Sequence, residues 1–246
     1  MTIVEHTEGL VPGPAAKASS VRIHGNLVQG SDEWIAARRG MLTASETKLI
    51  VTPTFKVAEN DKQRAHLYEL LAQRITGYVE PHYISDDMLR GMEDEFDALT
   101  LYSQHYAPTE TVGFITNDKW GFTLGYSPDG LVGTDGLVEI KSRRQRFQVE
   151  TFVNHVIPKA IPSEYLLQVQ TGMMVSERDW CDLISYSGGL PMAVIRVHAN
   201  DEIQENILTA AEKFEAKLTE AMARYREAVA VSGAVPTVRV DREIVL

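Results

Sequence analysis

The stretch GYSPDGLVGTDGLVEIKSRR, residues 125–144, restricts the fold more than any other part of the chain. Its centre, GTDG, predicts a tight turn, so we expect the short apolar segments on either side to pair as neighbouring strands. Side chains alternate along a strand, which places Glu139 and Lys141 on one face and points Ile140 into the core. Asp129, on the partner segment, can then approach Glu139.

Two converging carboxylates repel each other and favour a bound divalent cation. Mg²⁺ fits, because it prefers oxygen ligands and accepts two carboxylates together with a backbone carbonyl, water and substrate phosphate. We expect Asp129, Glu139 and the Ile140 carbonyl to be its protein ligands. Lys141 is expected to hold and help deprotonate an attacking water and to balance developing charge. The alternative, a hairpin with a turn aspartate and a surface Glu–Lys pair, stays open on this pattern alone.

A basic cluster follows the hairpin, although the chain has a formal net charge of −10. An acidic protein is repelled by the phosphate backbone of nucleic acids, but the distribution of charge matters more than its sum. Much of the acid lies in residues 85–98 and 201–228, which we expect to form outer helices. We expect Arg143, Arg144 and Arg146 to bind DNA, with an ordinary solvated face as the alternative.

Composition indicates one large domain. The chain has 246 residues, of which 44% are hydrophobic, and we expect a flexible leader at 1–20 followed by a single domain at 21–246 with an extended C-terminal tail. We expect no signal peptide and no transmembrane helix. The single cysteine, Cys181, excludes an internal disulfide and a cysteine-based zinc or iron–sulfur site in this chain alone, and it is expected in the core of a cytoplasmic protein.

The periodicity of apolar residues predicts an α/β fold. Short segments rich in β-branched and aromatic residues predict strands within 112–142, in WCDLISY and in MAVIRVHA. Helices are expected in these segments: two short ones within 31–50 that break near Gly40, then 60–77, 85–106, 149–156, a helix that Ser163 can cap, and 201–230. The resulting picture is a central mixed β-sheet flanked by helices, with a long C-terminal helix. The tail, VPTVRVDREIVL, is expected to add a strand to a sheet.

Several local signals set the expected helix ends. Ser31 can cap the first helix, and Thr43 with Glu46 has the spacing of a capping box. Gly77 is expected to end the helix at 60–77. The helix at 85–106 is expected to bury one apolar stripe, made of Met88, Met92, Phe96, Leu99 and Tyr102.

Other well-known motifs do not match. An EF-hand needs oxygen-bearing side chains where this chain has Leu131 and Gly133. GYSPD lacks the final glycine of the nucleophile elbow G-x-S-x-G. Walker A, H-E-x-x-H and G-x-G-x-x-G sequences are absent from the sequence, so the hairpin carries the best-supported chemistry.

Three segments together resemble the phage-lambda-type alkaline exonuclease family, the viral recombination branch of the PD-(D/E)XK nucleases. These segments are GSDEWIAARRGMLTASE, GYSPDGLV…LVEIKSRR and YLLQVQTGMMV. The resemblance covers roughly residues 29 to 200 and implies a restriction-endonuclease-like core. One departure is VEIKSRR, where some members of the family have LELKCP, so the path of the substrate beyond the lysine can differ.

The resemblance implies a role for each matching residue. Asp129 and Glu139 would be metal ligands, Lys141 the catalytic lysine, and Glu95 an acid that assists the metal site. Gln168 would contact the substrate phosphate. Arg38, Ser45 and Ser127 would grip a terminal 5′-phosphate, which suits a guanidinium and hydroxyl groups. Met88 would correspond to an apolar wedge between the strands, with a core methionine as the alternative.

The family also implies a function. We expect a Mg²⁺-dependent exonuclease, for which Mn²⁺ can substitute, that degrades double-stranded DNA in the 5′ to 3′ direction. It would release 5′-mononucleotides and leave a 3′ single strand for an annealing protein in a bacterial cell that carries a phage or prophage. A homotrimeric ring would let basic patches line a channel while the exterior stays acidic. The alternatives are a PD-(D/E)XK endonuclease and a catalytically silent module that binds DNA ends.

Overall fold

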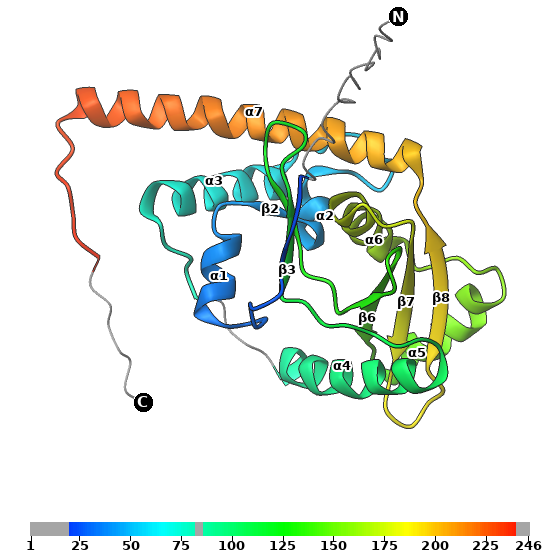
Figure 1. The fold of residues 1–246 in the computed structure, drawn as a ribbon. Coiled ribbons are helices and arrows are strands. Elements are labelled where there is room, and N and C mark those ends of the chain that lie inside the picture. Colours follow the sequence, from blue (N-terminus) through cyan, green and yellow to red (C-terminus); the bar gives the residue numbers. More distant parts are fainter. Residues whose placement is uncertain (1–19, 82–85, 240–246) are drawn as a thin grey trace, which may run out of the picture.

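The computed structural model describes residues 20–81 and 86–239, and the strands in this part of the chain form two four-stranded sheets (Figure 1). The strands are β1 Val21–His24, β2 Leu42–Thr43, β3 Phe114–Asn117, β4 Leu124–Tyr126, β5 Gly130–Val132, β6 Gly136–Ser142, β7 Trp180–Tyr186 and β8 Ala193–His198. One sheet has the order β1-β3-β4-β2 and the other β5-β6-β7-β8. Both are mixed, because β2 runs parallel to β4 and β6 runs parallel to β7, while the other pairs are antiparallel.

The expected α/β class is confirmed, but the strands divide between two sheets instead of forming one central sheet. The division falls between the end of β4 at Tyr126 and the start of β5 at Gly130. Pro128 lies in this gap and has no backbone N–H to donate, so a hydrogen-bonded ladder cannot run unbroken through it. The chain therefore passes from one sheet to the other at residues 127–129, beside the predicted metal ligand Asp129.

Helices lie on both sides of the sheets (Figure 1). They are α1 Asp32–Arg38, α2 Thr47–Ile50, α3 Asp61–Thr76, α4 Asp86–His105, α5 Gln145–Thr151, α6 Ser163–Ser176 and α7 Asp201–Ser232, with a 3₁₀ turn η1 at Ala44–Glu46 and a π-helical turn η2 at Phe152–Val156. Helix α6 is at the centre, and it is buried without interruption from Val169 to Ser176. It contacts η1 and α2, the first sheet through β3 and β4, and also β7 and α7.

The helix ends predicted from Ser31, Thr43 and Gly77 are confirmed, but Ser163 is the first residue of α6 and not its cap, and the helix expected at 149–156 already begins at Gln145. The Ser31 side chain accepts a hydrogen bond from the backbone N–H of Trp34 at the start of α1, and Thr43 and Glu46 form the capping box. Helix α3 ends at Gly77, whose φ of 66° is the left-handed conformation that glycine adopts at little cost. Two strands were not predicted: β1 near the start of the described chain, and β2, which follows the break at Gly40. A two-residue strand has almost no pattern of its own and depends on its pairing with β4.

Helix α4 was predicted correctly in extent but only half correctly in its buried face. Tyr102 is fully buried and Leu99 packs beside it, whereas Met92 is 56% exposed and Phe96 is 73% exposed. Ala98 and Tyr102 in the second half of α4 pack on β6 and β7. In the first half, Asp94 accepts a hydrogen bond from Ser142 of β6, but the apolar side chains Leu89 and Met92 remain exposed. The side chain of Met88 lies outside the described part of the structure.

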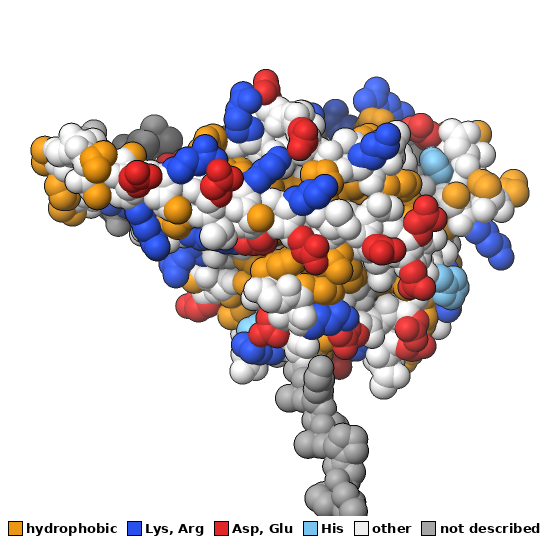
Figure 2. Space-filling view, turned by 90° about the horizontal axis from the view of Figure 1, so that it is seen from above, with side chains coloured by type: hydrophobic (Ala, Val, Ile, Leu, Met, Phe, Trp, Pro, Cys, Tyr) orange, Lys and Arg blue, Asp and Glu red, His pale blue; other side chains and the backbone are white. Residues whose placement is uncertain are grey.

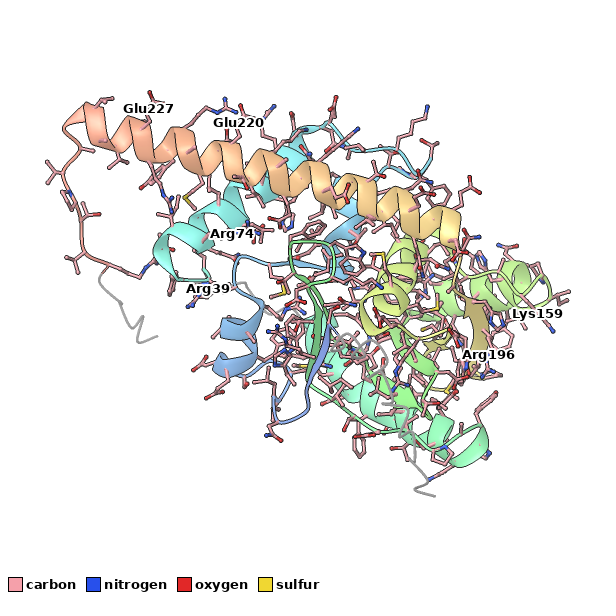
Figure 3. All side chains as sticks on the ribbon, turned by 45° about the horizontal axis from the view of Figure 1, so that its top comes forward. Arg39, Arg74, Lys159, Arg196, Glu220 and Glu227 are labelled. Carbon is pink, nitrogen blue, oxygen red and sulfur yellow. The ribbon has the colours of Figure 1, made fainter. Side chains whose placement is uncertain are left out.

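Helix α7 is the predicted long C-terminal helix, and it extends beyond the rest of the domain (Figure 1). Its buried residues end at Leu218, and Ala223 onward is exposed to solvent. Glu227 marks this far portion in Figure 3. The described part of the tail, 233–239, forms no strand. The rest of the tail, and residues 1–19 of the predicted leader, lie outside the described residues.

The surface over α7 carries charges of both signs. Figure 2 looks onto this helix and shows Lys and Arg side chains interleaved with Asp and Glu, so the acidic residues expected on this outer helix share its surface with basic ones. Within the described ranges, none of the helices is both long enough and apolar enough to cross a membrane.

The buried face of α7 yields a first prediction. Phe214 is 0% exposed and stacks on His66, whereas Val229 on the far portion is 44% exposed. Phe214→Ala should lower the free energy of unfolding by about 3–5 kcal/mol, since it leaves a cavity. Val229→Ala should change it by less than about 0.5 kcal/mol. Urea unfolding of both variants checks this, and a large loss from Val229→Ala would mean that the far portion is packed in solution.

Candidate active site

A cavity of about 200 Å³ lies where the chain passes from β4 to β5. The residues that line it come from α1, the β2–η1 segment, α4, both sheets and α6: Gln29, Trp34, Arg38, Thr43, Ala44, Ser45, Glu95, Tyr126, Ser127, Asp129, Glu139, Ile140, Lys141 and Gln168. Most of the residues singled out from the sequence are in this group. The cavity therefore brings together the predicted metal-binding residues and the predicted phosphate-binding residues, whose roles remain proposals.

The two central carboxylates are placed by the β5–β6 hairpin. Gly130 pairs with Val138 across it, so Asp129 stands at the start of β5 beside the middle of β6. Its Oδ2 accepts a hydrogen bond of 2.5 Å from the backbone N–H of Ile140. The Ile140 side chain is buried, and Glu139 lines the cavity from the same strand. The hairpin arrangement expected from the sequence is thus confirmed.

Glu139 is buried and accepts hydrogen bonds from three directions. The Lys141 ammonium, 2.7 Å away, and the Gln168 amide both donate to Oε1, and the Tyr126 hydroxyl donates to Oε2 at 2.9 Å. Each carboxylate oxygen has two lone pairs. Oε2 of Glu139 therefore keeps one free acceptor position, while Oδ1 of Asp129 has no hydrogen-bond partner among the described residues. By the same count, Oδ2 of Asp129 accepts one hydrogen bond, from Ile140, and keeps one free position, so both carboxylates have acceptor positions left for a ligand.

The ionisable side chains of the cavity are buried close to one another, and this shifts their pKa values. Burial, followed by the nearby Glu139 carboxylate, raises the pKa of Asp129 well above its usual range. Burial also raises the pKa of Glu95. For Lys141, burial lowers the pKa, but Glu139 and Asp129 together outweigh it and the net shift is upward. The ammonium of Lys141 thus keeps its proton while the carboxylates have no other counter-charge.

The donor set fits Mg²⁺ better than a transition metal. The described residues include no cluster of three or more His, Cys, Asp or Glu side chains that could hold a metal ion. A site with two carboxylates and a backbone group, open on one side to a cavity, is what Mg²⁺ uses when water and substrate phosphate complete its octahedron. Asp129 and Glu139 would hold the ion, with Ile140 as the backbone ligand. Glu95 lines the same cavity without forming a third member of a ligand cluster.

Tyr126 is a member of this site that the sequence analysis missed. Its ring packs against the backbone of Gly172 in α6, where a Cβ atom would approach the ring to 2.7 Å. Only glycine leaves room for this packing, which aims the hydroxyl at Glu139. Burial, followed by the Glu139 carboxylate, raises the pKa of Tyr126 well above its usual value. The phenol therefore stays protonated and donates to Glu139.

Arg38 stands on the other side of the cavity. Its guanidinium lies 4.2 Å from the centroid of the Trp34 ring, and its two terminal nitrogens donate to Ser127 at 3.0 Å and to Thr43 at 3.2 Å. Burial lowers the pKa of Arg38, and the nearby Glu46 carboxylate raises it in part. Arginine stays charged at any physiological pH. The Arg38 guanidinium is therefore a partly desolvated cation that lines the cavity and can bind an anion.

The neighbouring arginines lie outside the cavity. Arg39, labelled in Figure 3, donates from Nη1 to the carbonyl oxygen of Gly77 at the end of α3, at 2.7 Å, and it is not among the residues that line the cavity. Arg143, which we expect to bind DNA, has a guanidinium that pairs with Glu164 at 2.9 Å and contacts Tyr165. None of Arg143, Arg144 and Arg146 is among the residues that line the cavity, although Arg144 and Arg146 are exposed.

Trp34, Thr43 and Gln29 also belong to the cavity and were not predicted. Trp34 precedes Arg38 by four residues, which places both on one face of a helix, and this spacing was a readable signal. Thr43 had been interpreted only as a helix cap, and it serves both as that cap and as a partner of Arg38. Gln29 donates to the carbonyl oxygen of Pro128 at 3.0 Å, a contact between distant segments that no local pattern indicates.

Comparison with known proteins gives a consistent result. Residues 33–179 match the model of the YqaJ-like viral recombinase domain. The fold is similar to an alkaline exonuclease (LHK-Exo) from Laribacter hongkongensis, with a TM-score of 0.70 and 32% identity over 83% of this chain and 100% of that chain. A structure of the same protein in complex with dAMP gives a TM-score of 0.71. No curated protein sequence matches.

A more distant neighbour supports the fold alone. The phage related exonuclease from Haemophilus somnus 129PT is 14% identical, with a TM-score of 0.55 over 74% of this chain and 96% of that chain. The overall fold is thus similar although the two sequences have diverged widely.

The raised pKa of Asp129 yields the second prediction. A carboxylate whose pKa is higher in the folded state destabilises that state as the pH rises through this pKa. Asp129→Asn should therefore raise the free energy of unfolding in EDTA, by an amount on the order of 1 kcal/mol that is typical of single substitutions, and the gain should be larger at pH 8 than at pH 5. Mg²⁺ should raise the melting temperature of the wild type but not of the variant. A variant that Mg²⁺ stabilises as strongly as the wild type would contradict the assignment of this ligand.

Proposed function

Because the chain belongs to the family of YqaJ-like viral recombinase domains, we propose that it is a Mg²⁺-dependent exonuclease that digests one strand of double-stranded DNA from its 5′ end. The relationship to an alkaline exonuclease, at 32% identity over the whole of that chain, makes it a nuclease. The direction of digestion, the metal and the products are our proposal.

The observation that carries this proposal is that a pocket for an anion and a pair of metal-binding carboxylates share one cavity. Arg38 and Ser127 occupy one side and Asp129 and Glu139 the other. An enzyme that measures from a terminal phosphate needs both in one place. An endonuclease has no use for a terminal phosphate, and a module that only binds DNA ends has no use for Lys141 beside the carboxylates.

The chemistry is hydrolysis of a phosphodiester bond. Water attacks the phosphorus, the bond from phosphorus to the 3′ oxygen breaks, and the leaving oxygen takes up a proton. The first nucleotide departs as a 5′-mononucleotide, and the shortened strand keeps a new 5′-phosphate. Mg²⁺, or Mn²⁺ in its place, would polarise the phosphate and make the bound water more acidic. The related exonuclease has been solved with dAMP, a mononucleotide of this kind.

The residues of this chain have distinct tasks in that reaction. Asp129, Glu139 and the Ile140 carbonyl would hold the metal ion, and Glu95 would add negative charge nearby. Lys141 would orient the attacking water, take part in its deprotonation once a metal ion balances the carboxylates, and stabilise negative charge on the phosphate oxygens. Gln168, which donates to Glu139, can use its remaining amide hydrogen for the phosphate.

The terminal phosphate sets the register of each step. Arg38, Ser45 and Ser127 would bind it, and every cleavage supplies a new one, so the next scissile bond returns to the metal site. Gln168 would lie beside both the terminal phosphate and the metal site. This cycle explains why one strand would be consumed from the 5′ end while the other is released as a 3′ single strand.

Separation of the strands is assigned to α4. The sequence resemblance pointed to Met88 as a wedge, and exposed apolar side chains follow it on the same helix: Leu89, Met92 and Phe96. Glu95 of α4 lines the cavity, so this exposed face borders the place where the strand enters. Arg144 and Arg146, which are exposed, would contact the DNA backbone farther from the reacting phosphate.

A homotrimeric ring would reconcile this activity with a net charge of −10. Three copies would gather their basic residues around a channel that threads the duplex, while the net negative charge of the molecule reduces nonspecific binding elsewhere. The 3′ single strand would pass to an annealing protein. A ring that encloses DNA also keeps the enzyme on one molecule through many steps.

The third prediction concerns Lys141. Lys141→Ala should lower the single-turnover rate on 5′-phosphorylated duplex by about 10²–10⁴-fold, the usual contribution of a positioned proton-transfer group. Lys141→Arg should not restore it, because a guanidinium does not release its proton near neutral pH. Stabilisation by Mg²⁺ should persist in both variants. If Lys141→Arg digests at the wild-type rate, Lys141 contributes only a fixed positive charge and takes no part in proton transfer.

The fourth prediction tests end recognition, with Arg39 as the matched control. Arg38→Ala should slow digestion of 5′-phosphorylated duplex about 10- to 100-fold, since a hydrogen bond to a charged group contributes about 1.5–3 kcal/mol. It should leave the slower digestion of 5′-hydroxyl duplex nearly unchanged. Arg39→Ala removes a cation that points elsewhere and should have a small effect on both ends.

The measurement is initial digestion of both duplexes by the wild type and the two variants. Equal losses on both ends in Arg38→Ala would make this residue a general backbone contact. Nicking of closed circular DNA by the wild type would favour the endonuclease reading, and digestion from 3′ ends would reverse the proposed direction.

A further inference from the structure

The Ser127 hydroxyl is held between two hydrogen-bond donors. Nη1 of Arg38 and the indole N–H of Trp34 each donate to its Oγ at 3.0 Å. A serine hydroxyl has two lone pairs and one hydrogen, so both acceptor positions are in use. Within residues 20–81 and 86–239, no acceptor receives the hydrogen of Ser127, and this residue lines the cavity. The hydrogen is therefore left to point into the cavity.

Trp34 is itself held firmly. Its backbone N–H donates at 3.2 Å to the side chain of Ser31, which caps the start of α1. Its ring lies under the guanidinium of Arg38. The indole N–H is shared between Ser127 and the carbonyl oxygen of Gly113, which is 3.1 Å away. An indole nitrogen donates and never accepts, so in this position it can only supply a hydrogen to Ser127.

The hydrogen of Thr43 is fixed in the same manner. Its hydroxyl donates to Glu46 at 2.7 Å, which leaves its lone pairs to accept from Nη2 of Arg38 at 3.2 Å. Arg38 thus uses one N–H on each terminal nitrogen for protein partners. A guanidinium has five N–H groups, and the others are left for a ligand.

We propose that Trp34 is a positioning residue that makes the Ser127 hydroxyl a permanent donor to the terminal phosphate. With the Trp34 N–H in place, Ser127 has no free lone pair, so this side of the pocket presents only hydrogens. It then favours a ligand that consists of acceptors alone, which describes an ionised phosphate. This inference rests on the proposed function, because it deepens the role of the 5′-phosphate pocket.

Loss of the indole N–H would release one lone pair of Ser127. The hydroxyl would then turn between several orientations, and only part of its population would offer a hydrogen to the phosphate. The 5′-hydroxyl end gains nothing from the fixed orientation, since it has no anionic oxygen there. The effect of Trp34 should therefore appear only with phosphorylated ends.

Trp34→Phe is the test, because it keeps an aromatic ring under Arg38 and removes only the N–H. Binding of 5′-phosphorylated and 5′-hydroxyl duplexes is measured in EDTA, where no cleavage occurs. The affinity for the phosphorylated duplex should fall about 3- to 10-fold, the contribution of one hydrogen bond, and the affinity for the hydroxyl duplex should not change. Trp120→Phe, at a tryptophan that packs against Phe122 outside the cavity, should change neither. With Mg²⁺, the loss in Trp34→Phe should appear in KM and not in kcat.

A double-mutant cycle separates positioning from general packing. Ser127→Ala should weaken binding of the phosphorylated duplex, and Trp34→Phe should then cause no further loss in that background. A full additional loss, or equal losses on both duplexes, would overturn the inference while leaving the proposed function intact. A wild type that does not distinguish the two duplexes would overturn both. Melting temperatures of all variants show whether each one is folded.

Discussion

The hydrogen bonds to the buried carboxylate of Glu139 are the interactions on which the rest of the site depends. An ionised carboxylate is costly to bury unless it is fully hydrogen-bonded, and Glu139 obtains its donors from three parts of the fold. Lys141 comes from its own strand, Gln168 from α6 and Tyr126 from the other sheet. The two sheets and the central helix are thus joined around one carboxylate. Any shift of these elements relative to one another would leave that charge without a partner.

Much of the site could be predicted because its chemistry lies in one hairpin. The alternation of Glu139, Ile140 and Lys141 along a strand, with Asp129 across a tight turn, follows from local geometry alone. Helix ends were also predictable, since Ser31 and Gly77 act through contacts within a few residues. The resemblance to a known family supplied Arg38, Ser127 and Gln168, which local pattern does not connect to the hairpin.

What could not be predicted depends on contacts between distant segments. Tyr126 reaches Glu139 only because Gly172 leaves space for its ring, and neither residue indicates this in its own neighbourhood. The apolar stripe of α4 was extended too far, because a periodic pattern shows which face is apolar but not where the covering sheet ends. The division into two sheets likewise depends on how strands assemble. The single proline between β4 and β5 marks the place but does not by itself predict it.

The passage from β4 to β5 has a consequence for the length of each step. Ser127 faces the terminal phosphate in our proposal, Asp129 faces the metal, and only Pro128 separates them. Two residues of extended chain span at most about 7 Å, which is comparable with the distance between neighbouring phosphates on one DNA strand. On this proposal, the backbone from Ser127 to Asp129 would fix the distance between the phosphate pocket and the metal site, because covalent bonds and the closed ring of proline limit its length. Digestion by single nucleotides would then be a property of chain geometry, and it would be insensitive to the sequence of the DNA.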